Sequence, residues 1–258
     1  MTGTVDLLTA DTVAQLLTLA DLPGAHAVAV VGSAARGDAG AWSDIDVHAY
    51  VRSREQVRPT RPSFLDGRLV MLACDTIEGS RAELSVPERA IWAVPAFRDM
   101  RILLDREGQL LALKRDAEAF DWSVLRAEAE LSQQRRIADS AEFIYKIRAA
   151  LERHDESAVL HAAGALIGRC TRAVVTARGV FIRTENEYYR RAQDTAGPEW
   201  TRRHRECFGL GPAGPVALDA FAQGQAACGL FAETAKALDD ILDEPTRDTI
   251  RRALAAVE

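Results

Sequence analysis

The spacing of apolar residues changes near residue 120, and this change constrains the fold more than any other feature of the sequence. Before it, short apolar or alternating runs of strand length recur, of which Ala27–Val31 is the clearest. After it, apolar residues recur with helical spacing over long segments. The sequence therefore predicts an α/β domain over residues 1–120 and an all-helical domain over residues 121–258.

Four strands and three helices are expected in the first domain. The predicted strands are Ala27–Val31, Asp44–Val51, Arg68–Cys74 after a turn at Asp66-Gly67, and Met100–Leu104. The predicted helices are Asp11–Leu19 and Pro87–Ala93, with a short further helix that Ser33 can cap. In the second domain we expect helices over Asp121–Asp155, Glu156–Ala177 and Val216–Leu242, and a short one to the end. Small apolar residues surround nearly the whole of Ala158–Ile167, which predicts a helix buried in a bundle.

Charge and cysteine content exclude several classes of function. The formal net charge of the 258 residues is −6, whereas a protein that coats nucleic acid needs a basic face. The four cysteines show no Cys-x-x-Cys spacing, so neither a zinc site nor a disulfide frame is expected. The N-terminus lacks a basic segment followed by an apolar core, and no run of about 18 apolar residues occurs. We therefore expect a cytoplasmic protein without nucleic-acid or membrane partners.

Two carboxylates and a glycine-serine pair stand at the ends of the first two predicted strands. Asp44 and Asp46 are two positions apart in an extended segment, so their side chains project from the same face. Carboxylates placed side by side repel each other unless a cation or protons intervene, and hard oxygen ligands suit Mg²⁺. Gly32 allows a close approach of the backbone, and Ser33 with its neighbouring amides suits an anionic phosphate. This pattern predicts a magnesium and polyphosphate site.

The same residues resemble a known signature. Gly32-Ser33, ten intervening residues and then Asp44-Ile45-Asp46 are similar to the motif of the DNA polymerase β-like nucleotidyltransferase superfamily. Arg36 after the first pair and Ser43 before Asp44 look like its antibiotic (aminoglycoside and lincosamide) branch. The resemblance implies an α/β (α+β) nucleotidyltransferase domain with a small mixed sheet, followed by a helical-bundle substrate-binding domain. It implies Mg²⁺ on Asp44 and Asp46, and a nucleoside triphosphate held by Gly32, Ser33, Arg36 and Ser43.

The sequence departs from the family pattern at the third carboxylate. Where Asp66-Gly67-Arg68-Leu69-Val70 resembles the turn and strand that carry this acid, the next residue is Met71. A thioether is a poor ligand for Mg²⁺. Asp75 lies on the same strand face but about 13 Å further along, and Glu78 follows in the next loop. The sequence leaves three alternatives open: Asp75 replaces the missing acid, Glu78 replaces it, or no residue does.

A second pair of candidates lies in the helical domain. Glu142 and Lys146 are four residues apart and share a helix face. The resemblance implies that Glu142 is the general base for the acceptor hydroxyl and that Lys146 binds the triphosphate. The alternative is an ordinary ion pair on a helix surface, worth about 0.2–0.5 kcal/mol.

Together with these features, the resemblance implies a Mg²⁺-dependent enzyme that moves a nucleoside monophosphate, with ATP as the expected donor, to a hydroxyl of a small molecule. The net negative charge suits a cationic hydroxylated acceptor, and an aminoglycoside-like antibiotic is one candidate. Two alternatives remain open. Loss of the third acid would suit a nucleotide-binding regulatory protein without turnover, and some relatives in the superfamily adenylylate proteins.

Overall fold

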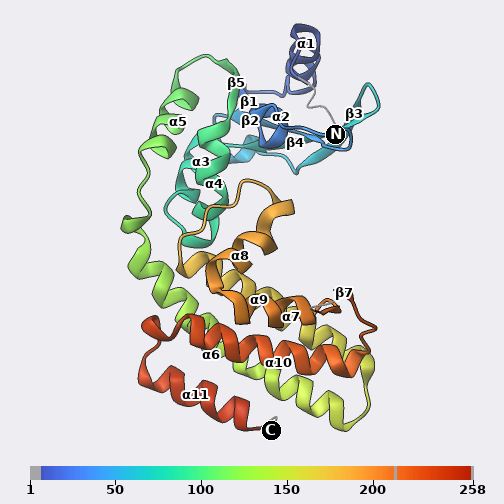
Figure 1. The fold of residues 1–258 in the computed structure, drawn as a ribbon. Helices are drawn as coiled ribbons and strands as arrows, with labels where there is room; N and C mark the ends of the chain where they lie inside the picture. The colour runs from blue at the N-terminus through green and yellow to red at the C-terminus, as the bar shows by residue number, and fades with distance from the viewer. Residues whose placement is uncertain (1–6, 212–213, 257–258) are drawn as a thin grey trace. The chain divides into compact units, whose positions relative to one another are not determined.

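The computed structural model describes residues 7–211 and 214–256, and its first part is built on a five-stranded sheet (Figure 1). The strand order is β3-β4-β2-β1-β5. The strands are β1 (Ala25–Val31), β2 (Ile45–Val51), β3 (Arg61–Leu65), β4 (Arg68–Asp75) and β5 (Arg101–Asp105). β2 and β4 pair in parallel, whereas the other neighbours are antiparallel, so the sheet is mixed as expected.

Helices cover the sheet and its ends. They are α1 (Ala10–Leu19), α2 (Gly32–Arg36), α3 (Ile77–Glu83), α4 (Pro87–Asp99) and α5 (Gln109–Ala119). Among the strands and α-helices of residues 7–119, the structure adds three that the sequence analysis did not predict, namely β3, α3 and α5. It also extends α4 beyond the predicted end at Ala93.

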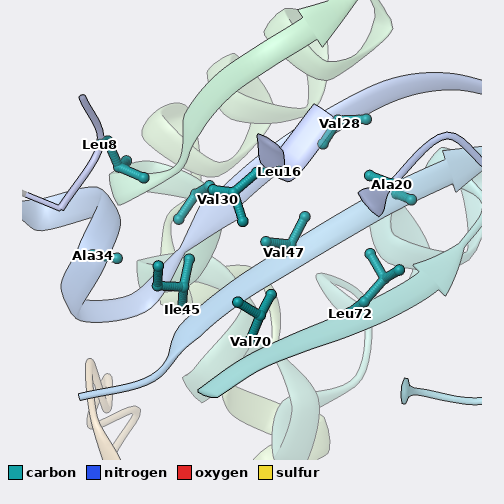
Figure 2. Packing of buried hydrophobic residues seen from close by; sticks show 11 residues of the cluster. Leu8, Leu16, Ala20, Val28, Val30, Ala34, Ile45, Val47, Val70 and Leu72 are labelled. Carbon is teal, nitrogen blue, oxygen red and sulfur yellow. The ribbon is translucent and has the colours of Figure 1, made fainter. Parts of the chain in front are cut away.

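One face of the sheet carries a hydrophobic core. Val28 and Val30 of β1, Val47 of β2, and Val70 and Leu72 of β4 lie in one layer (Figure 2). Leu8, Leu16, Ala20 and Ala34 pack against this layer from the N-terminal segment, α1 and α2. Burying one such aliphatic side chain contributes about 1.5–3 kcal/mol. The core therefore fixes β1 and β2 side by side, and their polar ends become the site described below.

The chain divides into two compact units. Unit 1 comprises Met1–Asp121 together with Phe181–Glu185, and unit 2 comprises Trp122–Val180 and Asn186–Glu258. A five-residue segment from the second half of the sequence thus belongs to the sheet-bearing unit. Residues 1–6, on which the expected absence of a signal segment partly rests, lie outside the described residues.

Unit 2 is a helical bundle, which confirms the expected fold class. Its helices are α6 (Arg126–Glu152), α7 (Glu156–Ala177), α8 (Tyr188–Ala196), α9 (Pro198–Glu206), α10 (Ala220–Ala237) and α11 (Glu244–Ala255). Two short strands, β6 (Leu210–Gly211) and β7 (Gly214–Pro215), form a hairpin. α10 begins later than predicted, at Ala220, because the Asp219 side chain accepts a hydrogen bond from the Ala222 amide (2.7 Å) and caps the helix.

α7 is the central helix of this bundle. In the described part of the chain it is the one helix long and apolar enough to cross a membrane. It contacts both α6 and α10, and 56% of its most apolar window is buried within the structure. Its apolar surface is therefore accounted for by packing inside the bundle, as predicted for Ala158–Ile167.

Candidate functional site

The Asp46 carboxylate lies close to the backbone of Gly32. β1 and β2 pair so that Val31 lies opposite Asp46, and Gly32 follows directly as the first residue of α2. Gly32 has a φ of +69°, and a Cβ placed on it would lie 2.8 Å from Asp46 Oδ2. Only glycine combines this left-handed backbone with room for the carboxylate. The Asp46 carboxylate therefore lies against the backbone at the end of β1.

The charges around Asp46 are predominantly negative. Its pKa is raised to about 6, first by burial and then by the negative charges of Asp44 and Glu185, while the guanidinium of Arg36 opposes the rise. Desolvation and like charges both disfavour a second ionised carboxylate. A divalent cation bound here would relieve that repulsion, so the arrangement fits the predicted metal site.

The loop before Asp44 is held by hydrogen bonds within unit 1. The Ser43 hydroxyl accepts from the Gly40 amide (2.9 Å), and Arg68 Nη1 donates to the Ser43 carbonyl (2.6 Å) and the Gly40 carbonyl (3.1 Å). Ser43 thus shapes the loop that presents Asp44. Its predicted contact with a nucleotide stays a prediction.

Ser33 does not cap α2, contrary to the expectation. The N-cap position is Val31, which makes no side-chain capping hydrogen bond, and Ser33 lies inside the helix. Gly32 stands at the start of the helix, where the φ of +69° and the nearby Asp46 carboxylate disfavour any side chain. Among the described residues the Ser33 hydroxyl has no hydrogen-bond partner, so it is available to a ligand.

Arg36 connects the site to the segment Phe181–Glu185, which comes from the second half of the sequence and belongs to unit 1. Its side chain is only 8% exposed; Nε donates to Asp38 Oδ2 (3.0 Å) and Nη1 donates to the carbonyl of Arg183 (3.2 Å). The sequence analysis assigned Arg36 to the nucleotide. The structure gives it an additional role, because it joins α2 to residues Phe181–Glu185.

Met71 lies directly opposite Asp46 in the parallel pairing of β2 and β4. Asp75 is opposite Tyr50, at the other end of the same pair of strands, and its carboxylate accepts hydrogen bonds from the Thr76 amide (2.7 Å) and the Ser80 hydroxyl (3.4 Å). Glu78 is exposed on α3 beyond that end. The strand does not bulge to bring Asp75 back towards Asp46, so neither candidate replaces the third acid in this structure.

Glu185 is a carboxylate near the site that the sequence analysis missed. It begins a short 3₁₀ helix (Glu185–Glu187), lies in the part of the chain that packs with unit 1, and its negative charge raises the pKa of Asp46. No spacing rule relates residue 185 to residues 44 and 46. Only the tertiary return of the chain places them near each other.

Glu142 and Lys146 lie in unit 2 on α6. They form an ion pair of 2.7 Å in which both side chains are more than half exposed, and the Lys146 ammonium lies 4.9 Å from the centre of the Phe143 ring. This is the geometry of an ordinary ion pair between residues four apart on a helix surface. The roles of Glu142 as general base and Lys146 as phosphate ligand stay predictions.

The donors at Asp44 and Asp46 fit Mg²⁺ in chemistry, because both supply hard carboxylate oxygens and the Gly32 backbone leaves room beside them. Among residues 7–211 and 214–256, no group of three or more His, Cys, Asp or Glu side chains converges closely enough to hold a metal ion by itself. A cation at this site would therefore depend on substrate phosphate oxygens and water for its remaining ligands, as Mg²⁺ commonly does.

Comparison with known proteins assigns a nucleotidyltransferase fold to the part of the chain with the mixed sheet. Residues 16–89 match the family described as the nucleotidyltransferase domain, and this range contains Gly32, Ser33, Asp44, Asp46 and Met71. The match supports nucleotidyl transfer as the general reaction of unit 1.

A solved structure has the same overall fold. It is the crystal structure of a nucleotidyltransferase-like protein from Exiguobacterium sibiricum, with 15% sequence identity and a TM-score of 0.50. The similarity covers 93% of this chain and 76% of that one. No curated protein sequence matches the chain.

Proposed function

We propose that the protein is a Mg²⁺-dependent nucleotidyltransferase that moves a nucleoside monophosphate from a nucleoside triphosphate, ATP in the first instance, to a hydroxyl of a small acceptor. The observation that carries the proposal is the contact between the Asp46 carboxylate and the Gly32 backbone beside Asp44, inside the segment that matches the nucleotidyltransferase domain. A cationic, hydroxylated acceptor such as an aminoglycoside suits the net charge of −6.

The residues of unit 1 have distinct tasks in this proposal. Asp44 and Asp46 would hold Mg²⁺, which supplies positive charge to the phosphate oxygens when bound. Gly32 and Ser33 offer a backbone without a side-chain obstacle and a hydroxyl for the triphosphate. Ser43 and Arg68 keep the loop before Asp44 in one conformation, so that the carboxylates do not have to be ordered during the reaction.

The reaction is an in-line displacement at phosphorus. The acceptor oxygen forms a bond to the α-phosphorus while the bond from that phosphorus to the bridging oxygen of pyrophosphate breaks, and pyrophosphate leaves with the electron pair. The hydroxyl proton passes to a base, for which Glu142 is the candidate from the sequence. The chain contributes mainly position and charge, as is general for phosphoryl chemistry.

A second candidate function is nucleotide binding without turnover. Met71 favours it, since this residue occupies the strand position opposite Asp46 where the family resemblance places a third acid. In that case the protein would act as a regulatory or interaction module that retains the nucleotide site.

The experiment is an incubation with Mg²⁺, ATP and a panel of aminoglycosides, lincosamides and other hydroxylated amines, with pyrophosphate release and product mass as the two measurements. Pyrophosphate together with an acceptor heavier by one nucleoside monophosphate supports the transferase. Tight binding of Mg-ATP with no pyrophosphate for any acceptor supports the regulatory function. A mass increase on a partner protein instead identifies a protein adenylyltransferase.

A further inference from the structure

Asp44 and Asp46 are the two carboxylates that the sequence motif supplies to the site. The paired strands β2 and β4 place no third carboxylate next to them. Met71 lies opposite Asp46, and Asp75 and Glu78 are at the far end of the sheet. A third carboxylate, if the site has one, must therefore come from another part of the chain. Among the described residues after 121, the segment Phe181–Glu185 is the part that belongs to unit 1.

Pro95 leaves a backbone acceptor in α4 free for the first hydrogen bond to the segment Phe181–Glu185. It lies inside α4, and a proline has no N–H to donate to the carbonyl four residues earlier, which is Ile91. The Ile91 carbonyl instead accepts a hydrogen bond from the Ile182 amide (2.8 Å). Ile182 itself is buried. A helix-breaking residue in α4 thus supplies the acceptor that holds the returning chain.

Three further contacts fix the segment on either side of Ile182. The guanidinium of Arg98 lies 5.1 Å from the centre of the Phe181 ring. Arg183 donates through Nε and Nη2 to Asp99 Oδ2 (3.0 and 2.9 Å). Arg36, which is buried beside the motif, donates to the Arg183 carbonyl (3.2 Å). Residues 181–183 are therefore held by α4 and α2 together.

This anchoring holds the chain on α2 two residues before Glu185, whose side chain is exposed. Glu185 lies two residues beyond the carbonyl that Arg36 holds, and its charge acts on Asp46 together with the charge of Asp44. Mg²⁺ keeps several waters in protein sites, so a carboxylate contributes to binding either directly or through a bound water.

We propose that Glu185 is the third carboxylate of the divalent-cation site and acts through a water bound to the cation, because Asp44, Asp46 and Glu185 do not converge closely enough to hold an ion by themselves. The segment Phe181–Glu185 thus supplies a carboxylate to a site in which Met71 occupies the strand position opposite Asp46. The inference rests on the proposed function, because it needs a cation at Asp44 and Asp46. It names a residue that lies more than 90 positions after the end of the matched family segment.

The test measures Mn²⁺ binding to the full-length protein by electron paramagnetic resonance, with a non-hydrolysable ATP analogue present and no turnover required. We expect Glu185→Gln to weaken Mn²⁺ binding about tenfold or more, in line with the loss of a supporting ligand. Glu187→Gln is the matched control two residues away, since the Glu187 carboxylate pairs with Arg190 (3.1 Å). Glu78→Gln controls for the loss of one negative charge elsewhere in unit 1. Both controls should bind Mn²⁺ as the unmodified protein does.

A rescue variant makes the assignment specific. Met71→Asp puts a carboxylate opposite Asp46, so adding it to Glu185→Gln should restore much of the lost Mn²⁺ affinity. Unchanged Mn²⁺ binding in Glu185→Gln, with binding lost in Asp44→Asn/Asp46→Asn, would overturn the role of Glu185 and leave the proposed function standing. Mn²⁺ binding that survives Asp44→Asn/Asp46→Asn would instead overturn the metal site itself. Circular dichroism establishes that each variant is folded.

Discussion

The amide of Ile182 donates to the carbonyl of Ile91, the backbone acceptor that Pro95 leaves without an intrahelical partner. Replacing Pro95 with alanine would provide an N–H that competes for that carbonyl. We expect Pro95→Ala to keep or raise the unfolding temperature, since an interior proline disfavours a helix by about 3 kcal/mol. We also expect at least about tenfold faster hydrogen exchange at the Ile182 amide and weaker Mn²⁺ binding.

Pro87→Ala is the control for this change. Pro87 is at the first position of the same helix, where a missing N–H removes no intrahelical hydrogen bond. It should leave the exchange of Ile182 unchanged. Equal exchange rates in the two variants would show that Pro95 has no part in holding the segment.

We expect Gly32→Ala to lower both the stability of the fold and the affinity of the site for a cation. Alanine is disfavoured at a φ of +69°, at a cost of about 1–2 kcal/mol, and its Cβ would also displace the Asp46 carboxylate. Gly37→Ala separates the two effects, because Gly37 has a φ of +77° and nothing within 4 Å of its added Cβ. Chemical denaturation should show similar losses of stability for both variants. Mn²⁺ titration should show a loss of affinity for Gly32→Ala alone, and a loss of equal size in both would contradict the contact with Asp46.

The structure also shows which parts of the fold can be predicted from sequence. β1 contains the uninterrupted apolar run Ala27–Val31, all of which is buried, so this sequence leaves little choice of structure. β3 was missed because it is a mostly exposed edge strand that contains Pro62, and neither apolar alternation nor strand propensity marks it. α4 was predicted to end before Pro95. It continues to Asp99 because a contact with Ile182 satisfies the carbonyl that the proline leaves free.

The residues of the site also divide into those that the sequence predicts and those that it does not. Gly32 directly follows β1, Asp44 directly precedes β2 and Asp46 lies in β2. Because β1 and β2 pair, local spacing in the sequence was enough to predict this part of the site. Glu185 lies in a segment that is held in unit 1 by a few isolated contacts of Phe181, Ile182 and Arg183. Such contacts have no periodic pattern in the sequence, which is why the sequence analysis considered Asp75 and Glu78 instead.

Trp42 should report on binding at the site. Its side chain is fully exposed, and it lies two residues before Asp44. We expect Trp42→Phe to change the unfolding free energy by no more than about 0.5 kcal/mol, as is usual for a surface position. Mg²⁺ with an ATP analogue should alter the tryptophan fluorescence of the unmodified protein and not that of Trp42→Phe. A fluorescence change of the same size in both would place the responding tryptophan elsewhere.

His204 should make unit 2 sensitive to acid. It is fully buried against Trp200 (ring centroids 4.8 Å apart), and burial lowers its pKa to about 4. Between pH 6.5 and 4 the unfolded chain binds a proton that folded His204 does not, so its contribution to stability is complete above pH 6.5 and is lost as the pH falls. At pH 5 the loss is roughly 2 kcal/mol relative to pH 7.

Urea unfolding of the unmodified protein and of His204→Phe at both pH values checks this, because the difference between the two proteins removes the contributions of all other groups. The variant should lose less stability between pH 7 and pH 5. His161→Phe, which removes an exposed histidine, is the control and should behave as the unmodified protein does. The same acid sensitivity in His204→Phe would contradict the burial argument.

The most direct test of the metal site compares Mn²⁺ binding in the unmodified protein and in Asp44→Asn/Asp46→Asn, each with and without a non-hydrolysable ATP analogue. The account predicts that the unmodified protein binds Mn²⁺ more tightly when the analogue is present. It predicts that the double variant, folded by circular dichroism, loses this binding, since it lacks both carboxylates. Equal Mn²⁺ binding by the two proteins, with the analogue present, would contradict a cation held by Asp44 and Asp46.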